Sequence, residues 1–180
     1  MYLQYSTVHT LSQMTIILNS EVLSDLAVSN TIHLQRKKQP NTTASYNYYV
    51  TPKLGFGLHC PKVIEATPKY IVIQFDKVNC INLLALFRKV NTYLLNKCGI
   101  DSSIKVYNFF SEQESTFTVR CSLPGYKGNY FISCDDASNP FKVPRRNSTL
   151  GYVEVDIRNI WQTEAKAGFN LELKKIKTEI

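Results

Sequence analysis

Aromatic rings that alternate with cations are the side chains of this sequence best suited to chemistry with a ligand. The chain contains 11 Tyr, 9 Phe and 1 Trp. In the predicted strand 104–110, Lys105, Tyr107 and Phe109 share one face, because side chains alternate between the two faces of a strand. Exposed rings can stack on unpaired bases, with about 1–3 kcal/mol per base, while neighbouring cations contact phosphates. This pattern favours binding of single-stranded nucleic acid, although a second small core or a subunit contact would also use such rings.

Cations elsewhere in the chain extend this pattern. The formal net charge is +7 and the sequence pI is about 9.1. Such a balance suits a polyanion, while a solvated basic surface is the simpler alternative. One group of cations precedes the aromatic segment at Tyr48, and another follows Phe141 in a polar loop. The residues predicted to bind nucleic acid are Arg36, Lys37, Lys38, Tyr48, Lys105, Tyr107, Phe109, Arg120, Phe141, Lys142, Arg145, Arg146 and Arg158.

Motifs for catalysis or phosphate binding are missing from the sequence. Gly55-Phe56-Gly57 lacks the third glycine of a dinucleotide loop, and His59-Cys60 would place a base and a nucleophile on opposite faces of a strand. Asp135-Asp136 lacks the further oxygen ligands that a divalent cation needs. The five cysteines form no C-x-x-C pair, so we expect reduced thiols. The sequence therefore predicts a protein that is not an enzyme and that uses no metal or cofactor.

One long helix among many strands defines the predicted fold. Apolar residues recur at three- and four-residue spacing over residues 79–98, and Gly99 can end a helix there. Alternating apolar residues predict strands, as in residues 115–123. We therefore expect a mainly β (α+β) fold, an OB-like closed or partly open barrel with the helix packed against it. A two-sheet β-sandwich is the alternative.

Length and hydropathy bound the organisation of the chain. Residues 1–180 suit a single domain, in which residues 1–30 can form an N-terminal arm or extra elements and residues 135–149 form a long basic loop. No apolar stretch reaches the ~20 residues of a membrane-spanning helix, and the N-terminus lacks the pattern of a secretory signal. We therefore expect an intracellular protein, cytoplasmic or nuclear, that is not secreted and has no membrane partner.

The position of Trp161, the only tryptophan, depends on the regularity of its strand. In a regular strand Trp161 shares its face with Val153, Val155 and Ile157, which favours a place in the core. A bulge at Asn159, or the turn, would instead direct the indole toward a ligand. The sequence favours the core and leaves the second arrangement open.

Charged residues are expected on the outward face of the same closing hairpin. Glu154 and Asp156 lie two residues apart, with Arg158 next along that face, so we expect an exposed, salt-bridged surface. Lys166 and Lys174 should also point outward. These cations are candidates for contacts with a polyanion.

The closing hairpin also carries a resemblance to a known family. Val153-Glu154-Val155-Asp156-Ile157 and Ile160-Trp161 are followed by a polar break, Ala167-Gly168 and Phe169-Asn170-Leu171-Glu172-Leu173. This order resembles the last hairpin of single-stranded DNA-binding OB-fold proteins of large DNA viruses and related phages, over about the last 25–30 residues. The resemblance implies an OB-like barrel and a role in replication. Those proteins typically carry an acidic C-terminal tail for replication partners, whereas this chain ends in "LKKIKTEI".

The functional expectation that follows is non-enzymatic binding of single-stranded DNA, in the replication of a virus or mobile element. RNA is an alternative ligand, because discrimination depends on contacts to the 2′-hydroxyl. A homo-oligomer and replication proteins are further partners to consider. The alternative function is a viral structural protein, a coat or matrix subunit with a β-sandwich, in which exposed rings would form subunit contacts.

Overall fold

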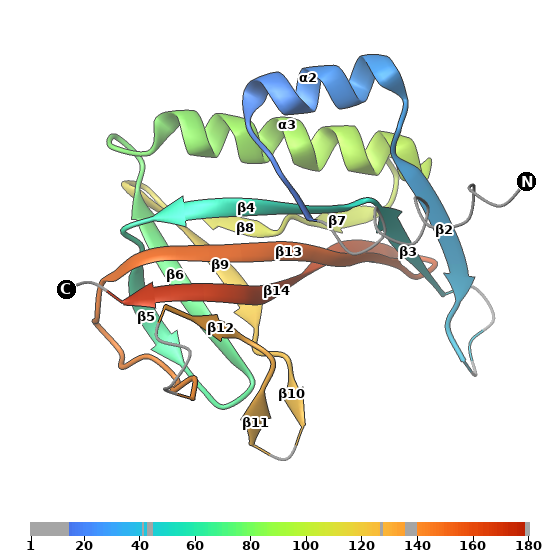
Figure 1. The fold of residues 1–180 in the computed structure, drawn as a ribbon. Coiled ribbons are helices and arrows are strands. Elements are labelled where there is room, and N and C mark those ends of the chain that lie inside the picture. Colours follow the sequence, from blue (N-terminus) through green and yellow to red (C-terminus); the bar gives the residue numbers. More distant parts are fainter. Residues whose placement is uncertain (1–14, 41, 43–44, 127, 136–139, 179–180) are drawn as a thin grey trace, which may run out of the picture.

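Two long strands at the end of the chain form the centre of the fold. In the computed structural model, which describes residues 15–40, 42, 45–126, 128–135 and 140–178, β13 (Leu150–Gln162) pairs antiparallel with β14 (Lys166–Thr178) along its length. Figure 1 shows this hairpin crossing the molecule below two helices, α2 (Ser20–Ser29) and α3 (Ile81–Cys98).

Shorter strands extend the sheet on both sides of this hairpin. They are β1 (Thr15–Ile17), β2 (His33–Lys38), β3 (Tyr46–Thr51), β4 (Lys53–His59), β5 (Lys62–Ala66), β6 (Tyr70–Asp76), β7 (Lys105–Tyr107), β8 (Phe110–Glu112), β9 (Thr116–Ser122) and β12 (Ser133–Cys134). A separate two-stranded sheet consists of β10 (Gly125–Tyr126) and β11 (Asn129–Tyr130). The expectation of a mainly β (α+β) fold is confirmed.

Strand pairing divides β13 into two halves. Its first half pairs with β4, which carries β1 on its other edge, and its second half pairs with β3, which carries β2. On the far side of the hairpin, β14 pairs with β7, β9 and β12, and the sheet continues through β6 to β5. Within the described residues this mixed sheet runs from β1 to β5, and no closed barrel is found.

The long helix α3 supplies one side of the core, as its apolar spacing predicts. Leu84, Phe87, Val90 and Leu94 are buried, and Gly99 ends the helix in the left-handed conformation that favours glycine. The helix begins two residues later than the predicted 79–98 and ends at the predicted residue.

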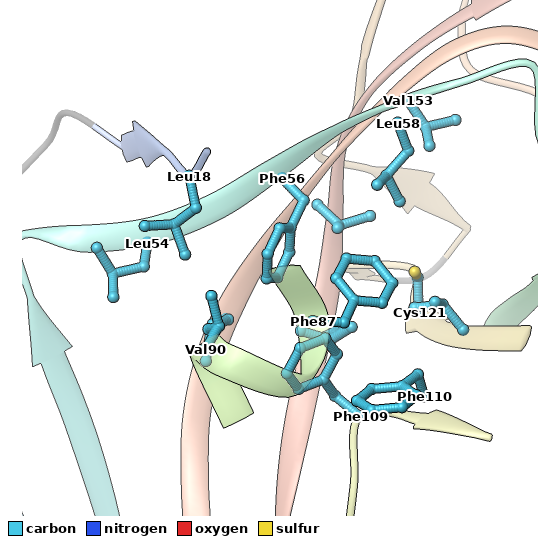
Figure 2. Packing of buried hydrophobic residues seen from close by; sticks show 14 of the residues in the cluster. Leu18, Leu54, Phe56, Leu58, Phe87, Val90, Phe109, Phe110, Cys121 and Val153 are labelled. Carbon is cyan, nitrogen blue, oxygen red and sulfur yellow. The ribbon is translucent and has the colours of Figure 1, made fainter. Parts of the chain in front are cut away.

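Phenylalanine rings join α3 to the sheet. Phe87 packs edge-to-face on Phe56 of β4 at 4.8 Å between ring centroids and on Phe109 at 5.1 Å. Figure 2 shows these three rings and Phe110 gathered between the helix and the strands. The core therefore lies on the helix side of the sheet, and the opposite side is here called the outer face.

The N-terminal elements belong to this fold. Asn19 caps α2 by accepting a hydrogen bond from the backbone N–H of Val22, and Leu23 and Leu26 are buried. The helix lies beside α3, where the Tyr93 hydroxyl donates to the Leu26 carbonyl at 3.5 Å. Of the predicted arm 1–30, residues 1–14 lie outside the described residues, as do residues 136–139 of the predicted loop. No helix in the described part of the chain is long and apolar enough to span a membrane.

Candidate nucleic-acid interface

A β-bulge at Arg158 decides where Trp161 points. Ile157 pairs with Leu171, but Asn159 pairs with Asn170, so Arg158 is an extra residue on β13. Beyond the bulge, Ile160 is fully buried, and its neighbour Trp161 therefore points to the outer face. The favoured expectation of Trp161 in the core is wrong, because one extra residue, Arg158 rather than Asn159, reverses the alternation of the strand. Contact of the indole with a ligand stays a prediction.

Trp161 and Tyr107 form a stacked pair on this outer face. Their ring centroids are 6.2 Å apart with an interplanar angle of 28°, and both residues pair across strands with Gly168. A Cβ atom at position 168 would lie 2.7 Å from Cζ2 of the indole, so only glycine lets the ring lie over β14. Tyr107 is 43% exposed. We call Trp161, Tyr107 and Gly168 the aromatic platform.

Cations surround the aromatic platform. The ammonium of Lys105 lies 5.3 Å from the centroid of the Tyr107 ring, and Lys166 is the exposed strand partner of Lys105. On the other side of the platform, the ammonium of Lys37 lies 5.4 Å from the ring centroid of Tyr49, a half-buried residue. All three lysines are exposed, and the ammonium groups of Lys105 and Lys37 lie close enough to a ring for a cation–π contact.

Strand register aligns these groups in one row. Lys37, Asn47, Trp161, Gly168 and Tyr107 are successive cross-strand partners on β2, β3, β13, β14 and β7. At about 4.8 Å between neighbouring strands, the row is ~19 Å long. The row begins at the cation of Lys37 and ends at the ring of Tyr107, beside which lies Lys105, two residues away on the same strand.

A ladder of asparagine side chains runs beside the platform. The Asn159 amide donates to Oδ1 of Asn47 at 2.9 Å, and the Asn170 amide donates to Oδ1 of Asn159 at 3.1 Å. Asn159 is buried, whereas Asn170 is exposed. We call Asn47, Asn159 and Asn170 the asparagine ladder, which fixes polar side chains across β3, β13 and β14.

Carboxylates occupy the next part of the outer face. Glu172 accepts from Lys174 at 2.8 Å and pairs with Arg158 at 3.6 Å. Asp156 is only 3% exposed and accepts a hydrogen bond from the Thr15 hydroxyl at 3.1 Å. Arg158 thus pairs with Glu172 on the neighbouring strand rather than with Glu154 or Asp156 as expected. The expectation that Asp156 is exposed is also wrong, because its carboxylate is buried against Thr15 of β1.

Burial of Asp156 has a consequence for stability. Desolvation raises the pKa of this carboxyl above its ordinary 3.8, although the Thr15 hydrogen bond and Lys174 and Lys53 act in the opposite direction. The folded protein therefore holds this proton at a higher pH than the unfolded chain. As the pH rises through the window between the two pKa values, the contribution of Asp156 lowers the free energy of unfolding.

Asp156→Asn should remove this part of the pH dependence. The amide cannot ionise, and its oxygen can still accept from Thr15. We expect the variant to be more stable than the wild type above the window and to lack the corresponding fall in stability. Urea unfolding from about pH 3 to pH 8 measures this difference. Stability curves that stay parallel across this range would contradict the prediction.

Two of the predicted binding residues lie in the core. Tyr48 is buried and donates to Oε1 of Gln162 at 2.6 Å, and burial raises its pKa. Phe109 is buried against Phe87 and Phe169. The expectation that Phe109 shares an exposed face with Tyr107 is wrong, because β7 ends at Tyr107 and the chain turns inward. Neither ring has a free face for a base.

Other predicted residues are exposed but lie apart from the platform. The guanidinium of Arg36 lies 3.6 Å from the centroid of the Tyr46 ring. Arg36 and Lys38 share one face of the β2–β3 hairpin, and Lys37 lies on the opposite face. Arg120 lies 3.7 Å from the centroid of the Tyr70 ring on β6. These three cations are therefore not part of the row.

The loop that precedes β13 lies at the far end of the hairpin from Trp161. Lys142, Arg145 and Arg146 are exposed there, and Phe141 is half-buried with its ring 5.0 Å from Tyr130. Figure 1 shows this loop at the opposite end of the molecule from β2 and β3. At about 3.3 Å per residue, β13 separates the two basic groups by roughly 35 Å.

The structure thus brings together Lys37, Lys105 and Tyr107 of the predicted residues and adds Trp161, whereas Arg158 pairs with Glu172 on the next part of the outer face. Within the described residues, no group of three or more His, Cys, Asp and Glu side chains could hold a metal ion. No protein-family model matches this chain, and a search of curated proteins returns no similar sequence.

Proposed function

We propose that this protein binds single-stranded nucleic acid, with DNA as the first candidate, through the aromatic platform. The observation that carries the proposal is the stack of Trp161 on Tyr107 on the outer face, with exposed cations on both sides. Unpaired bases stack on such rings, and cations follow the phosphates. Within this proposal, the curved sheet with α3 on its inner side serves as an OB-like, partly open barrel.

Single strands suit this surface better than a duplex. The rings of the platform lie on the sheet, so a base must present its flat face to reach them. In a duplex these faces are covered by neighbouring base pairs, and only the phosphates remain accessible. Stacking should therefore add about 1–3 kcal/mol per base to the binding of a single strand alone.

The charge distribution limits the footprint of a short strand. Glu154, Asp156 and Glu172 lie on the outer face between the platform and the loop that carries Arg145 and Arg146. Arg158 and Lys174 pair with Glu172 there, so this part of the face offers a phosphate little net positive charge, and a short strand should occupy the platform only. The loop cations should contribute to the binding of longer strands.

Binding to matched nucleic acids tests this function. Fluorescence anisotropy with single-stranded DNA, single-stranded RNA and duplex DNA of one length should show the tightest binding for a single strand, and affinity should fall with salt. Equal affinity for duplex and single strand, or affinity independent of salt, would exclude the proposal. In the viral structural alternative, sedimentation would show large closed particles without nucleic acid.

Lys105→Ala should lower the salt dependence of binding. If Lys105 neutralises one phosphate, the slope of log affinity against log salt should become shallower by about 0.7, the value for a single strand. Lys89→Ala on the exposed side of α3 is the matched control and should leave the slope unchanged. Equal changes in the two variants would indicate attraction by net charge rather than contact at the platform.

A further inference from the structure

A second aromatic side chain lies on the outer face, at the far end of the hairpin from Trp161. Val153 is fully buried, so its neighbour Tyr152 points outward. A Cβ atom at Gly57 of β4 would lie 2.7 Å from the Tyr152 hydroxyl oxygen and 3.1 Å from Cε2, so the glycine leaves room for this ring on the sheet. Gly168 leaves room for the indole of Trp161 in the same way.

The ring of Tyr152 has a partner at each side. Its hydroxyl donates to Oε1 of Glu154 at 3.0 Å. Its cross-strand partner on β4 is His59, an exposed residue whose ring centroid lies 4.9 Å from that of the tyrosine. Imidazole and phenol rings are both flat enough to stack on a base. The pair therefore presents an exposed ring that rests against a second, hydrogen-bonded ring.

A cation lies beside these two rings. The cross-strand partner of Tyr152 on β14 is Lys177, so His59, Tyr152 and Lys177 form a row across three strands, here called the far row. The ammonium of Lys177 lies 3.8 Å from a carboxylate oxygen of Asp135, and both side chains are nearly half exposed. Exposed pairs of this kind contribute little to stability, so a phosphate can replace the carboxylate.

We propose that the far row is a second binding site for the same single strand, an inference that rests on the proposed function. Tyr152 and Trp161 are nine residues apart on β13, which is roughly 30 Å at about 3.3 Å per residue. A short strand therefore occupies the platform alone. A longer strand reaches both sites, and its second contact forms at the high effective concentration that the first contact creates. The ligand of the far row is an unpaired base with its phosphate.

Oligonucleotides with two binding tracts test this inference on the wild-type protein. Two thymidine tracts of about four nucleotides, the lower limit for such sites, are joined by a polyethylene glycol spacer of variable length. Fluorescence anisotropy should show an affinity at least about fivefold higher than that of one tract, the factor that corresponds to weak stacking of one base. The gain should be largest when the spacer spans roughly 30 Å and should fall for shorter and much longer spacers.

Removal of the bases from one tract separates stacking from charge. Abasic sugars in the second tract keep its phosphates, so the fivefold gain should be lost if a base stacks on the far row. A second tract that binds equally well without its bases would overturn the inference, because cations alone would then hold it. A gain that is absent or independent of spacer length would also overturn it. These results leave the proposed function standing.

His59→Ala and Tyr152→Ala supply the protein side of the test. Each variant should lose the gain from the second tract and keep the wild-type affinity for one tract, because the platform is intact. His59 is the exposed last residue of β4, so its replacement leaves the core unchanged. Lys89→Ala on α3 is the control and should keep the gain. A gain that survives in either ring variant would overturn the inference, and a wild-type protein that does not bind one tract would overturn the proposed function as well.

Discussion

Replacing Phe87 by alanine should lower the free energy of unfolding by about 3–5 kcal/mol, the usual cost of deleting a buried phenyl ring. Phe87 has no exposed surface, and its ring contacts Phe56, Phe109, Phe110 and Phe117. The substitution leaves a cavity where α3 meets the sheet. Since small domains have only about 5–15 kcal/mol of net stability, equilibrium urea unfolding should show a large shift of the midpoint.

Phe131→Ala is the matched control for this substitution. Phe131 is 68% exposed, so its loss should change the free energy of unfolding by no more than about 0.5 kcal/mol. If both variants lost the same stability, the core would not lie between α3 and the sheet.

The double replacement of Trp161 and Tyr107 by alanine should produce the largest loss of nucleic-acid affinity. Each ring should contribute about 1–3 kcal/mol of stacking, which corresponds to roughly 5- to 150-fold in the dissociation constant. Because the two rings are stacked neighbours, the loss in the double variant should differ from the sum of the single losses. Fluorescence anisotropy with labelled single-stranded DNA measures all three variants.

Two further variants make this result specific. Trp161→Phe keeps a flat ring and should retain most of the affinity. Phe131→Ala removes an exposed ring from the loop between β11 and β12, outside the strands of the platform, and it should leave the affinity unchanged. A double variant that binds as tightly as the wild type would show that the strand binds elsewhere.

The helices and strands that depend on the spacing of nearby residues could be predicted from the sequence. Helix α3 follows from its apolar repeat and from Gly99, and β9 follows from the alternation of Phe117, Val119 and Cys121, which are all buried. Local periodicity decides such elements, because one face of each must meet the core. The open order of the strands depends on pairings between distant segments, which spacing does not encode.

The aromatic platform could be predicted from the sequence only in part, for a similar reason. Lys105 and Tyr107 were predicted from their alternation, but the side on which Trp161 lies depends on one bulged residue, Arg158. Phe109 was misplaced because a strand of three residues ends before the alternation reaches it. Gly168, the cross-strand partner of Trp161, is the sequence feature that could have indicated the outward indole, since a glycine opposite a tryptophan leaves room for the flat ring.

The emission of Trp161 reports directly on whether a single strand binds at the platform, because it is the only tryptophan of the chain and it lies there. Unlabelled single-stranded DNA is titrated into the protein while the emission is recorded, and anisotropy of a labelled strand follows binding in parallel. The platform predicts that the emission is quenched with the same dissociation constant as the anisotropy signal, that added salt reverses the change, and that duplex DNA produces little quenching. Saturable binding of the labelled strand with unchanged Trp161 emission would contradict the claim.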